Sequence, residues 1–172
     1  PAEHLPAPAS VARAAARPTG AVVATPSAAQ VLVLGARGRL GQALVIAFSR
    51  AGWTVLAQVR PGASRALPPG PAAQSIRRIE SDLRDPEALA AAAAGTAVVV
   101  NALSPGDYGR RAWAREVPVQ IAFALAVTRR LGATLMQPGN VYPYGRSLPA
   151  RLDEQTPFAA DTHHGRLRQR LE

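Results

Sequence analysis

Apolar and polar positions follow two different periods along the chain. From Gln30 onward, short continuous apolar runs alternate with longer segments in which apolar residues recur every three to four positions. The short runs are typical of strands buried on both faces of a sheet, and the longer segments are typical of amphipathic helices. The predicted strands are Val31–Leu34, Trp53–Val59, Ile76–Ile79, Ala97–Leu103 and Thr134–Met136. The predicted helices are Arg39–Ala51, Glu87–Ala94 and a long helix from near Val117 to Arg130.

Residues that commonly begin or end helices lie at the borders of these segments. Asp85 can cap the second helix, and Pro86 fits its first turn, where a missing N–H does no harm. Gly52, Gly95 and Gly132 follow the three helices. Glycine is common just beyond a helix because it adopts the left-handed conformation without strain. The periodicity and the border residues therefore predict the same elements.

Strands that alternate with helices predict a particular fold class. Such βαβ units have right-handed crossovers and form a parallel sheet that is covered on both faces. We therefore expect an α/β fold of Rossmann-like type, with a doubly wound parallel sheet of strand order 3-2-1-4-5 in a three-layer α/β/α arrangement. The ligand of such a sheet binds beyond the carboxyl ends of the strands, where the strand order reverses.

The length of 172 residues suits one such domain and is too short for two. Residues 30–172 are predicted to form it. Residues 1–29 contain five prolines, and we expect a disordered Ala/Pro-rich extension there. An organellar transit peptide is the alternative, because this segment contains arginine and is nearly free of acidic residues. No apolar run reaches the ~18 residues of a membrane span, so we expect a cytoplasmic protein without a membrane partner.

The connection after the first strand is rich in glycine. It consists of Gly35, Ala36, Arg37, Gly38, Arg39, Leu40 and Gly41. The first glycine can take the turn, the second lets the backbone approach a pyrophosphate, and the third lets the helix pack closely on the strand. The start of the helix adds free N–H groups and a partial positive charge. The pattern predicts a dinucleotide site; a tight turn without a ligand is the alternative.

The spacing G-x-x-G-x-x-G resembles that of the short-chain dehydrogenase/reductase superfamily. Within it, the chain looks most like the extended or atypical branch known as NAD-dependent epimerase/dehydratase. Three further stretches agree. Ser81–Asp85 resembles the D-L-x-D segment, Val98–Leu103 resembles the V-x-N-A-A/G strand end, and Asn140–Tyr142 with Asp153–Pro157 resembles the "VYG … E-x-T-P" passage. The resemblance covers residues 30–172.

The resemblance implies roles for several residues. Asp82 and Leu83 are expected to contact the adenine, and Asn101, Ala102 and Leu103 are expected to lie on the nicotinamide side. The implied function is that of an NAD(P)-binding oxidoreductase domain. Its substrate would be a nucleotide-sugar or another carbonyl or alcohol compound.

The end of the second predicted strand favours one form of the cofactor. A carboxylate at this position would bind the ribose 2′-OH of NAD and repel the 2′-phosphate of NADP. The strand ends at Gln58–Arg60, and no acidic residue occurs between Glu3 and Glu80. Arg60 and Arg37 can instead hold the phosphate in a bidentate manner. We therefore expect NADP(H) in preference to NAD(H); an ordinary solvated loop arginine is the alternative for Arg60.

The catalytic residues that the resemblance implies are not present in their usual form. The family uses a Tyr-x-x-x-Lys pair after the fifth strand. By spacing, the Tyr falls at His164 and the Lys at Arg168, and the accompanying Ser and Asn fall near Pro138 and Pro118. Because all 20 basic residues are arginine, no shift of register restores the lysine.

Two interpretations follow from this departure. His164 can act as a replacement proton donor with Arg168 on the ribose, and Tyr142 is a second candidate donor or else a packing residue. Alternatively, the domain is a non-catalytic NADP(H)-binding module that senses redox state or forms a scaffold for a partner. The sequence ends at Glu172, before the sixth strand and substrate domain of the extended branch. We expect either a fragment or a reduced form that lacks the C-terminal substrate domain.

Composition removes several other classes of function. The absence of cysteine excludes disulfides and thiol catalysis, and with three histidines we predict no metal site. The net charge of +9 attracts phosphates, or else reflects arginines spread over a solvated face. Interleaved aromatic residues and a recognised reader motif are lacking, so we expect no nucleic-acid partner. The helix Val117–Arg130 is a candidate surface for a homodimer.

Overall fold

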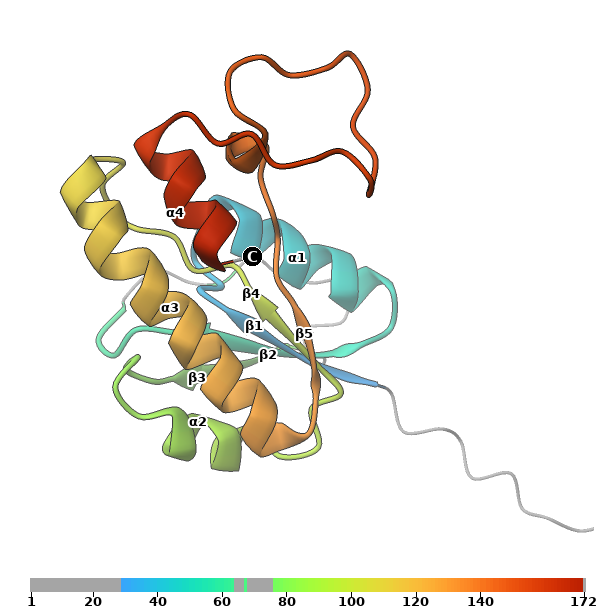
Figure 1. The fold of residues 1–172 in the computed structure, drawn as a ribbon. Coiled ribbons are helices and arrows are strands. Elements are labelled where there is room, and N and C mark those ends of the chain that lie inside the picture. The colour runs from blue at the N-terminus through green and yellow to red at the C-terminus, as the bar shows by residue number, and fades with distance from the viewer. Residues whose placement is uncertain (1–28, 64–66, 68–75, 172) are drawn as a thin grey trace, which may run out of the picture.

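The computed structural model describes residues 29–63, 67 and 76–171. Within them, five strands form one parallel sheet of order β3-β2-β1-β4-β5, as predicted (Figure 1). The strands are β1 (Gln30–Leu34), β2 (Thr54–Val59), β3 (Ile76–Glu80), β4 (Val98–Asn101) and β5 (Thr134–Met136). The central strand β1 pairs with β2 and with β4, so the strand order reverses there.

Helices cover both faces of this sheet and bury its side chains in two clusters. Helix α1 (Arg39–Arg50) packs on one face, where Val45 meets the β1 residues Val31 and Val33. Helices α2 (Pro86–Ala92) and α3 (Arg110–Leu131) pack on the other face (Figure 1). There Leu89 and Phe123 contact the opposite side of the same strands. Alternate residues of β1 therefore point to opposite faces, which gives the predicted α/β/α layers.

The long helix begins earlier than the sequence pattern predicted. The prediction placed its start near Val117, but α3 begins at Arg110 and carries Pro118 in its interior. Gly109 adopts an extended conformation as the N-cap, and its N–H donates to Oδ1 of Asp107 over 2.8 Å. The prediction was wrong because it took the proline as a first-turn residue. Strong helix formers precede it, and packing of Trp113 and its neighbours offsets the cost of an interior proline.

After β5 the chain forms the 3-10 helix η2 (Tyr142–Tyr144) and then α4 (His163–Leu171). Figure 1 shows α4 beside the first half of α3. Leu167 of α4 packs against Trp113, Val117 and Ile121 of α3 in a small third cluster. These contacts place the C-terminal segment at the same end of the molecule as the carboxyl edge of the sheet.

The borders predicted from single residues are confirmed. Asp85 caps α2, where its Oδ1 accepts the N–H of Ala88 over 2.8 Å. Gly132 ends α3 in the left-handed conformation, with φ of 61°. The extension predicted for residues 1–29 lies outside the described residues except for its last position. None of the described helices combines the length and the apolar character that crossing a lipid bilayer would require.

Candidate functional site

A cleft of about 1140 Å³ lies at the carboxyl edge of the sheet. Segments that follow four parallel strands form its floor, because parallel strands end at the same edge. They contribute the turn after β1 with Gly35, the segment after β2 with Arg60, the segment after β3 with Asp82, and the segment after β4 with Ala102. The first half of α3 forms another wall. The cleft therefore lies where the strand order reverses.

The first and third glycines of the turn after β1 stand where a side chain would not fit. Gly35 has φ of +70°, and a Cβ there would lie 3.0 Å from the carbonyl oxygen of Ala102. A Cβ on Gly41 would lie 2.8 Å from Cα of Ala36 and still closer to the carbonyl oxygen of Gly35. The absence of side chains lets α1 begin directly against the turn. The result is a helix N-terminus beside the cleft.

The turn is held from below by Gln58, which is 1% exposed. Its Oε1 accepts the N–H of Gly35 over 2.9 Å, and its Nε2 donates to the carbonyl oxygen of Ser81 over 2.8 Å. The backbone oxygen of Gln58 accepts the N–H of Ala36 over 3.0 Å. One buried side chain thus joins the ends of β1, β2 and β3. At this position, near which a ribose-binding carboxylate would stand, the glutamine has a structural function instead.

The start of α1 presents backbone N–H groups that the fold does not use. The N–H of Gln42 makes the first helical hydrogen bond, to the carbonyl oxygen of Gly38 over 2.8 Å. The amides before it in the first turn have no helical acceptor. Gly38 makes no side-chain cap, and the first turn contains no acidic residue. The helix start is therefore open to an anion, with the helix dipole favouring its charge.

Two arginines without a carboxylate partner among the described residues line the cleft. Arg37 lies in the glycine turn, and Arg60 follows β2; both are exposed, and neither takes part in the four ion pairs of the described chain. The segment after Arg60 is tied to β3, because Oε2 of Glu80 accepts the N–H of Gly62 over 3.3 Å. Arg78 donates to the carbonyl oxygen of Ala63 and pairs with Glu80 at 2.7 Å.

The segments after β3 and β4 contribute the residues that the family resemblance singled out. Asp82 and Leu83 line the cleft, and Oδ1 of Asp82 accepts the N–H of Arg84 over 3.1 Å. Ala102 and Leu103 also line it. Asn101 is buried behind them, where its Nδ2 donates to Oε1 of Gln137 over 2.8 Å. Asn101 therefore links β4 to the end of β5.

The predicted cofactor residues divide into two groups by position. Those that line the cleft are Gly35, Arg37, Gly38, Arg60, Asp82, Leu83, Ala102 and Leu103. Those that do not line it are Ala36, Arg39, Leu40, Gly41 and Asn101. Ala36, Gly41 and Asn101 are buried, whereas Arg39 and Leu40 are exposed residues of the first helical turn. Side chains of the second group shape the turn or flank it; the amides of Arg39 and Leu40 belong to the open helix start.

The sequence prediction missed the wall formed by α3. Arg115, Glu116, Val119 and Gln120 line the cleft from this helix. Arg115 pairs with Glu116, with 2.8 Å between Nη2 and Oε1. The predicted start near Val117 left the first two of these residues in a loop. The helical spacing of 115 to 119 and of 116 to 120 would have revealed a common face if the helix had been extended through Pro118.

The predicted catalytic residues lie apart from this lining. The ring of His164 contacts Trp113 edge-on, with centroids 4.6 Å apart, and its Nε2 lies 3.2 Å from the carbonyl oxygen of Tyr108. The ring of Tyr142 is 6.2 Å from that of His164. Arg168 is buried, and its Nη2 donates to the carbonyl oxygen of Pro138 over 2.9 Å. The structure brings His164 and Tyr142 together in an aromatic cluster, and it places Arg168 beside the end of β5.

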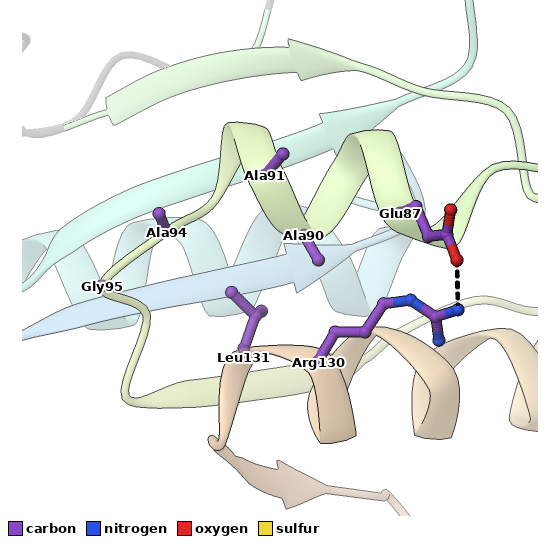
Figure 2. Close-up of a pocket in the computed structure, with 7 residues that line it drawn as sticks. All are labelled: Glu87, Ala90, Ala91, Ala94, Gly95, Arg130 and Leu131. Carbon is purple, nitrogen blue, oxygen red and sulfur yellow. Dashed lines mark hydrogen bonds and ion pairs between the residues drawn. The ribbon is translucent and has the colours of Figure 1, made fainter.

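A smaller hollow of about 350 Å³ lies at the opposite edge of the sheet, between α2 and the end of α3. Figure 2 shows the alanine side chains of α2 and the side chain of Leu131 around it. Nη2 of Arg130 lies 2.7 Å from Oε1 of Glu87 across its rim. The hollow adjoins the segments that lead into β4 and β5. Among the described residues, His, Asp and Glu do not gather in threes as metal ligands.

Comparison with protein families gives one match to this chain. The model of the NmrA-like family matches residues 27–129, which include the glycine turn, β1 to β4 and nearly all of α3. No curated protein matches the sequence.

Several solved structures share the fold of this chain. A candidate epimerase from Burkholderia cenocepacia J2315 is 26% identical, with a TM-score of 0.64 over 85% of this chain and 48% of its own. The Bordetella bronchiseptica enzyme WbmG in complex with NAD is 20% identical, with a TM-score of 0.64 over 87% of this chain and 50% of its own. UDP-N-acetylglucosamine 4-epimerase from Bacillus cereus is 15% identical, with a TM-score of 0.64 over 84% and 50%.

These comparisons confirm the predicted Rossmann-like fold and the resemblance to the epimerase/dehydratase group. At 20% and 15% identity, the second and third structures show the fold alone. The chain spans about half the length of each of the three.

Proposed function

The chain belongs to the NmrA-like family, and from this premise we propose that its cleft binds a nicotinamide dinucleotide, NADP(H) in preference to NAD(H). In this proposal, the domain is the cofactor-binding part of an oxidoreductase that acts on a nucleotide-sugar or another carbonyl or alcohol compound. The cofactor residues are those of the glycine turn together with Arg60, Asp82, Leu83, Asn101, Ala102 and Leu103.

The open helix start beside the cleft is the observation that carries this proposal. A diphosphate needs several N–H donors and a close approach to the backbone. The first turn of α1 offers such donors, and Gly38, which lines the cleft, has no side chain to hinder that approach. The cleft volume of about 1140 Å³ lies slightly above the ~300–1,000 Å³ of common ligand sites. The residues present therefore suit the dinucleotide.

The preference for NADP(H) is supported by charge at the end of β2. Arg60 and Arg37 line the cleft without a carboxylate partner among the described residues, whereas Gln58, which is neutral, is engaged in holding the turn. A guanidinium binds the 2′-phosphate of NADP(H) with two parallel hydrogen bonds. It cannot bind the 2′-hydroxyl of NAD(H) in this bidentate way. Among the described residues, the end of β2 thus offers the charge that a 2′-phosphate needs and has no carboxylate that would repel it.

A bound nicotinamide ring would supply hydride transfer to or from the substrate. For the proton that accompanies this step, we propose His164 or Tyr142 as donor and Arg168 as the ribose-binding residue. The contact between Arg168 and the carbonyl oxygen of Pro138 supports this assignment, because it places the guanidinium at the end of β5, next to the carboxyl edge of the sheet.

A non-catalytic NADP(H)-binding module is the second candidate function, as a redox sensor or a scaffold for a partner. One observation favours it: none of the three proposed catalytic side chains lines the cleft in the described part of the chain. Turnover of a panel of carbonyl compounds with NADPH, compared between the native chain and His164→Ala, separates the two functions. Turnover that depends on His164 supports the enzyme, and cofactor binding without turnover supports the sensor.

Calorimetric titration with NADPH and NADH tests the proposed cofactor. We expect NADPH to bind at least about tenfold more tightly, since a charge-assisted contact contributes roughly 1.5–3 kcal/mol. Arg60→Ala should reduce this preference and leave NADH binding nearly unchanged. Arg129→Ala is the matched control, because it removes an exposed arginine from the far end of α3. Failure of both nucleotides to bind would overturn the proposal, and an NADH preference would overturn its finer part.

A further inference from the structure

Helix α3 changes character along the side that it turns toward the sheet. Phe123, Ala124 and Val127 pack in the apolar cluster against β1, β2 and β4. One helical turn earlier, the same stripe continues as Gln120 and then Glu116, since residues three and four apart share a face. Both of these residues line the cleft. The stripe thus becomes polar where the helix passes the carboxyl edge of the sheet.

Gln120 is largely buried as a residue, and its amide makes no hydrogen bond to another described residue. The residue is 8% exposed. Two other buried polar side chains have protein partners: Asn101 donates to Gln137 over 2.8 Å, and Thr128 donates to the carbonyl oxygen of Ala124 over 2.7 Å. The amide atoms of Gln120 are not among the enclosed polar atoms of the described residues that lack a partner, so they reach the open cleft. Because Gln120 lines the cleft, its amide is available to bond to a ligand there.

Apolar residues stand on the same side of the sheet as this amide. Leu83 and Leu103 follow β3 and β4, line the cleft, and pack against the cluster that contains Phe123. Val119 lines the cleft from α3 itself. Apolar side chains around one amide suit a flat heteroaromatic ring with hydrogen-bonding groups on its edge.

We propose that Gln120 recognises the adenine base of the dinucleotide through the amino group and N7 of the ring. This inference rests on the proposed function. A primary amide offers one acceptor beside one donor, which matches the exocyclic amino group and N7 of adenine in a bidentate pair. Asp82 and Leu83, which the family resemblance assigns to the adenine, line the same cleft as Gln120, and this supports the adenosine half as its partner.

The nicotinamide carboxamide is the other group in the cofactor that matches an amide. The two sources are separated with fragments: adenosine 2′,5′-bisphosphate carries the adenine, and nicotinamide mononucleotide carries the carboxamide. We expect Gln120→Met to weaken the first fragment and leave the second unchanged. The reverse result would overturn the proposal.

The direct test compares NADPH with its hypoxanthine analogue, in which a carbonyl oxygen replaces the amino group. The native chain should bind the analogue about tenfold more weakly, because one bond of the bidentate pair is lost. Gln120→Met should bind the two nucleotides equally, and Gln155→Met, an exposed loop substitution, should behave as the native chain. Equal binding by the native chain would overturn the role of Gln120. Failure of both nucleotides to bind would instead overturn the proposed function.

Thermal unfolding without nucleotide gives a second readout that a merely structural glutamine would not produce. Because Gln120→Met keeps the side-chain length and removes an amide that bonds to no other described residue, we expect the midpoint of unfolding to change little while the increase caused by NADPH shrinks. A lower midpoint in the absence of nucleotide would show that the amide stabilises the fold itself, and would overturn the proposal.

Discussion

The close contact between α1 and the turn after β1 depends on a single missing side chain. A Cβ at Gly41 would meet Cα of Ala36 at 2.8 Å, so the helix start would have to move away from the turn. The backbone on both sides is held, because the N–H of Ala36 donates to the carbonyl oxygen of Gln58. Since backbone cannot yield as a flexible side chain does, a substitution here strains the fold and disturbs the anion site together.

We therefore expect Gly41→Ala to lower the free energy of unfolding by about 1–3 kcal/mol, the usual cost of overpacking. It should also weaken NADPH binding. Chemical denaturation and calorimetry measure the two effects. Gly106→Ala is the matched control, because no atom lies within 4 Å of its added Cβ, and it should change neither quantity. An unaffected Gly41→Ala protein would contradict the close packing described above.

Gln58 provides a second residue-scale prediction. Gln58→Leu leaves the N–H of Gly35 and the carbonyl oxygen of Ser81 without their side-chain partner, and we expect a loss of about 1–3 kcal/mol for an unpaired buried group. Urea denaturation measures the loss, with Gln155→Leu at an exposed loop position as the control. A loss no larger than that of the control would show that the two backbone groups do not depend on this amide.

The residues of the glycine turn could be predicted because their constraint is local. Gly35, Gly38 and Gly41 lie within seven positions, between a strand and a helix that the sequence pattern marks clearly. The role of Gln58 could not be predicted in this way. Its partners, Gly35 and Ser81, are each 23 positions away, and the parallel pairing of β1, β2 and β3 brings them together.

At the scale of elements, α3 shows how tertiary packing overrides a local signal. Pro118 indicated a helix start, yet Trp113 and Val117 before and beside it pack against Leu167 of α4. That contact lies about 50 positions away along the chain, so no window around Pro118 reveals it. Strands β1 and β4 were easier to predict, because continuous apolar runs of four residues, Val31–Leu34 and Ala97–Val100, are a local signal.

Replacing the interior proline tests this interpretation. Pro118→Ala restores an N–H that can bond to the carbonyl oxygen of Ala114, and we expect the fold to gain about 1–2 kcal/mol after the greater freedom of the unfolded chain is subtracted. Thermal unfolding measures the gain. Val119→Thr, at the neighbouring position that is 55% exposed, changes a side chain of similar helix propensity without restoring a backbone donor and should not stabilise. A destabilised Pro118→Ala protein would show that the packing requires the proline.

Two acidic residues at the start of α2 should differ in their effect on stability. Asp85→Ala removes the acceptor of the Ala88 N–H and should cost about 1 kcal/mol. Glu87→Gln breaks the ion pair with Arg130 that Figure 2 shows, and should cost less than about 0.5 kcal/mol because Glu87 is 76% exposed. Denaturation of both variants decides the order, and an equal or larger loss at Glu87 would contradict it.

At the scale of the whole molecule, the strand order alone predicts where the cleft lies, but it does not predict which residues line it. A parallel sheet of order 3-2-1-4-5 places its crevice beyond the strand ends on either side of β1, and the cleft lies there. The proposed catalytic residues were assigned by spacing across residues 137–162, where the pattern has no periodicity. The structure places His164 beside Trp113 and leaves the role of His164 a prediction.

The chain spans about half the length of the solved structures that share its fold. The nucleotide-sugar substrate and dimerisation through α3 therefore remain predictions, whereas the open helix start, the arginines without a carboxylate partner and the cleft-lining amide of Gln120 all belong to the described residues.

The central claim is that the first turn of α1 receives the diphosphate of a dinucleotide. The most direct measurement is a titration of the ¹⁵N-labelled chain with NADPH, followed through the backbone amide resonances. We predict that the resonances of Arg37, Gly38, Arg39 and Leu40 shift most strongly and saturate together with those of Arg60 and Leu83. Shifts confined to other surfaces, or none at saturating nucleotide, would contradict the claim.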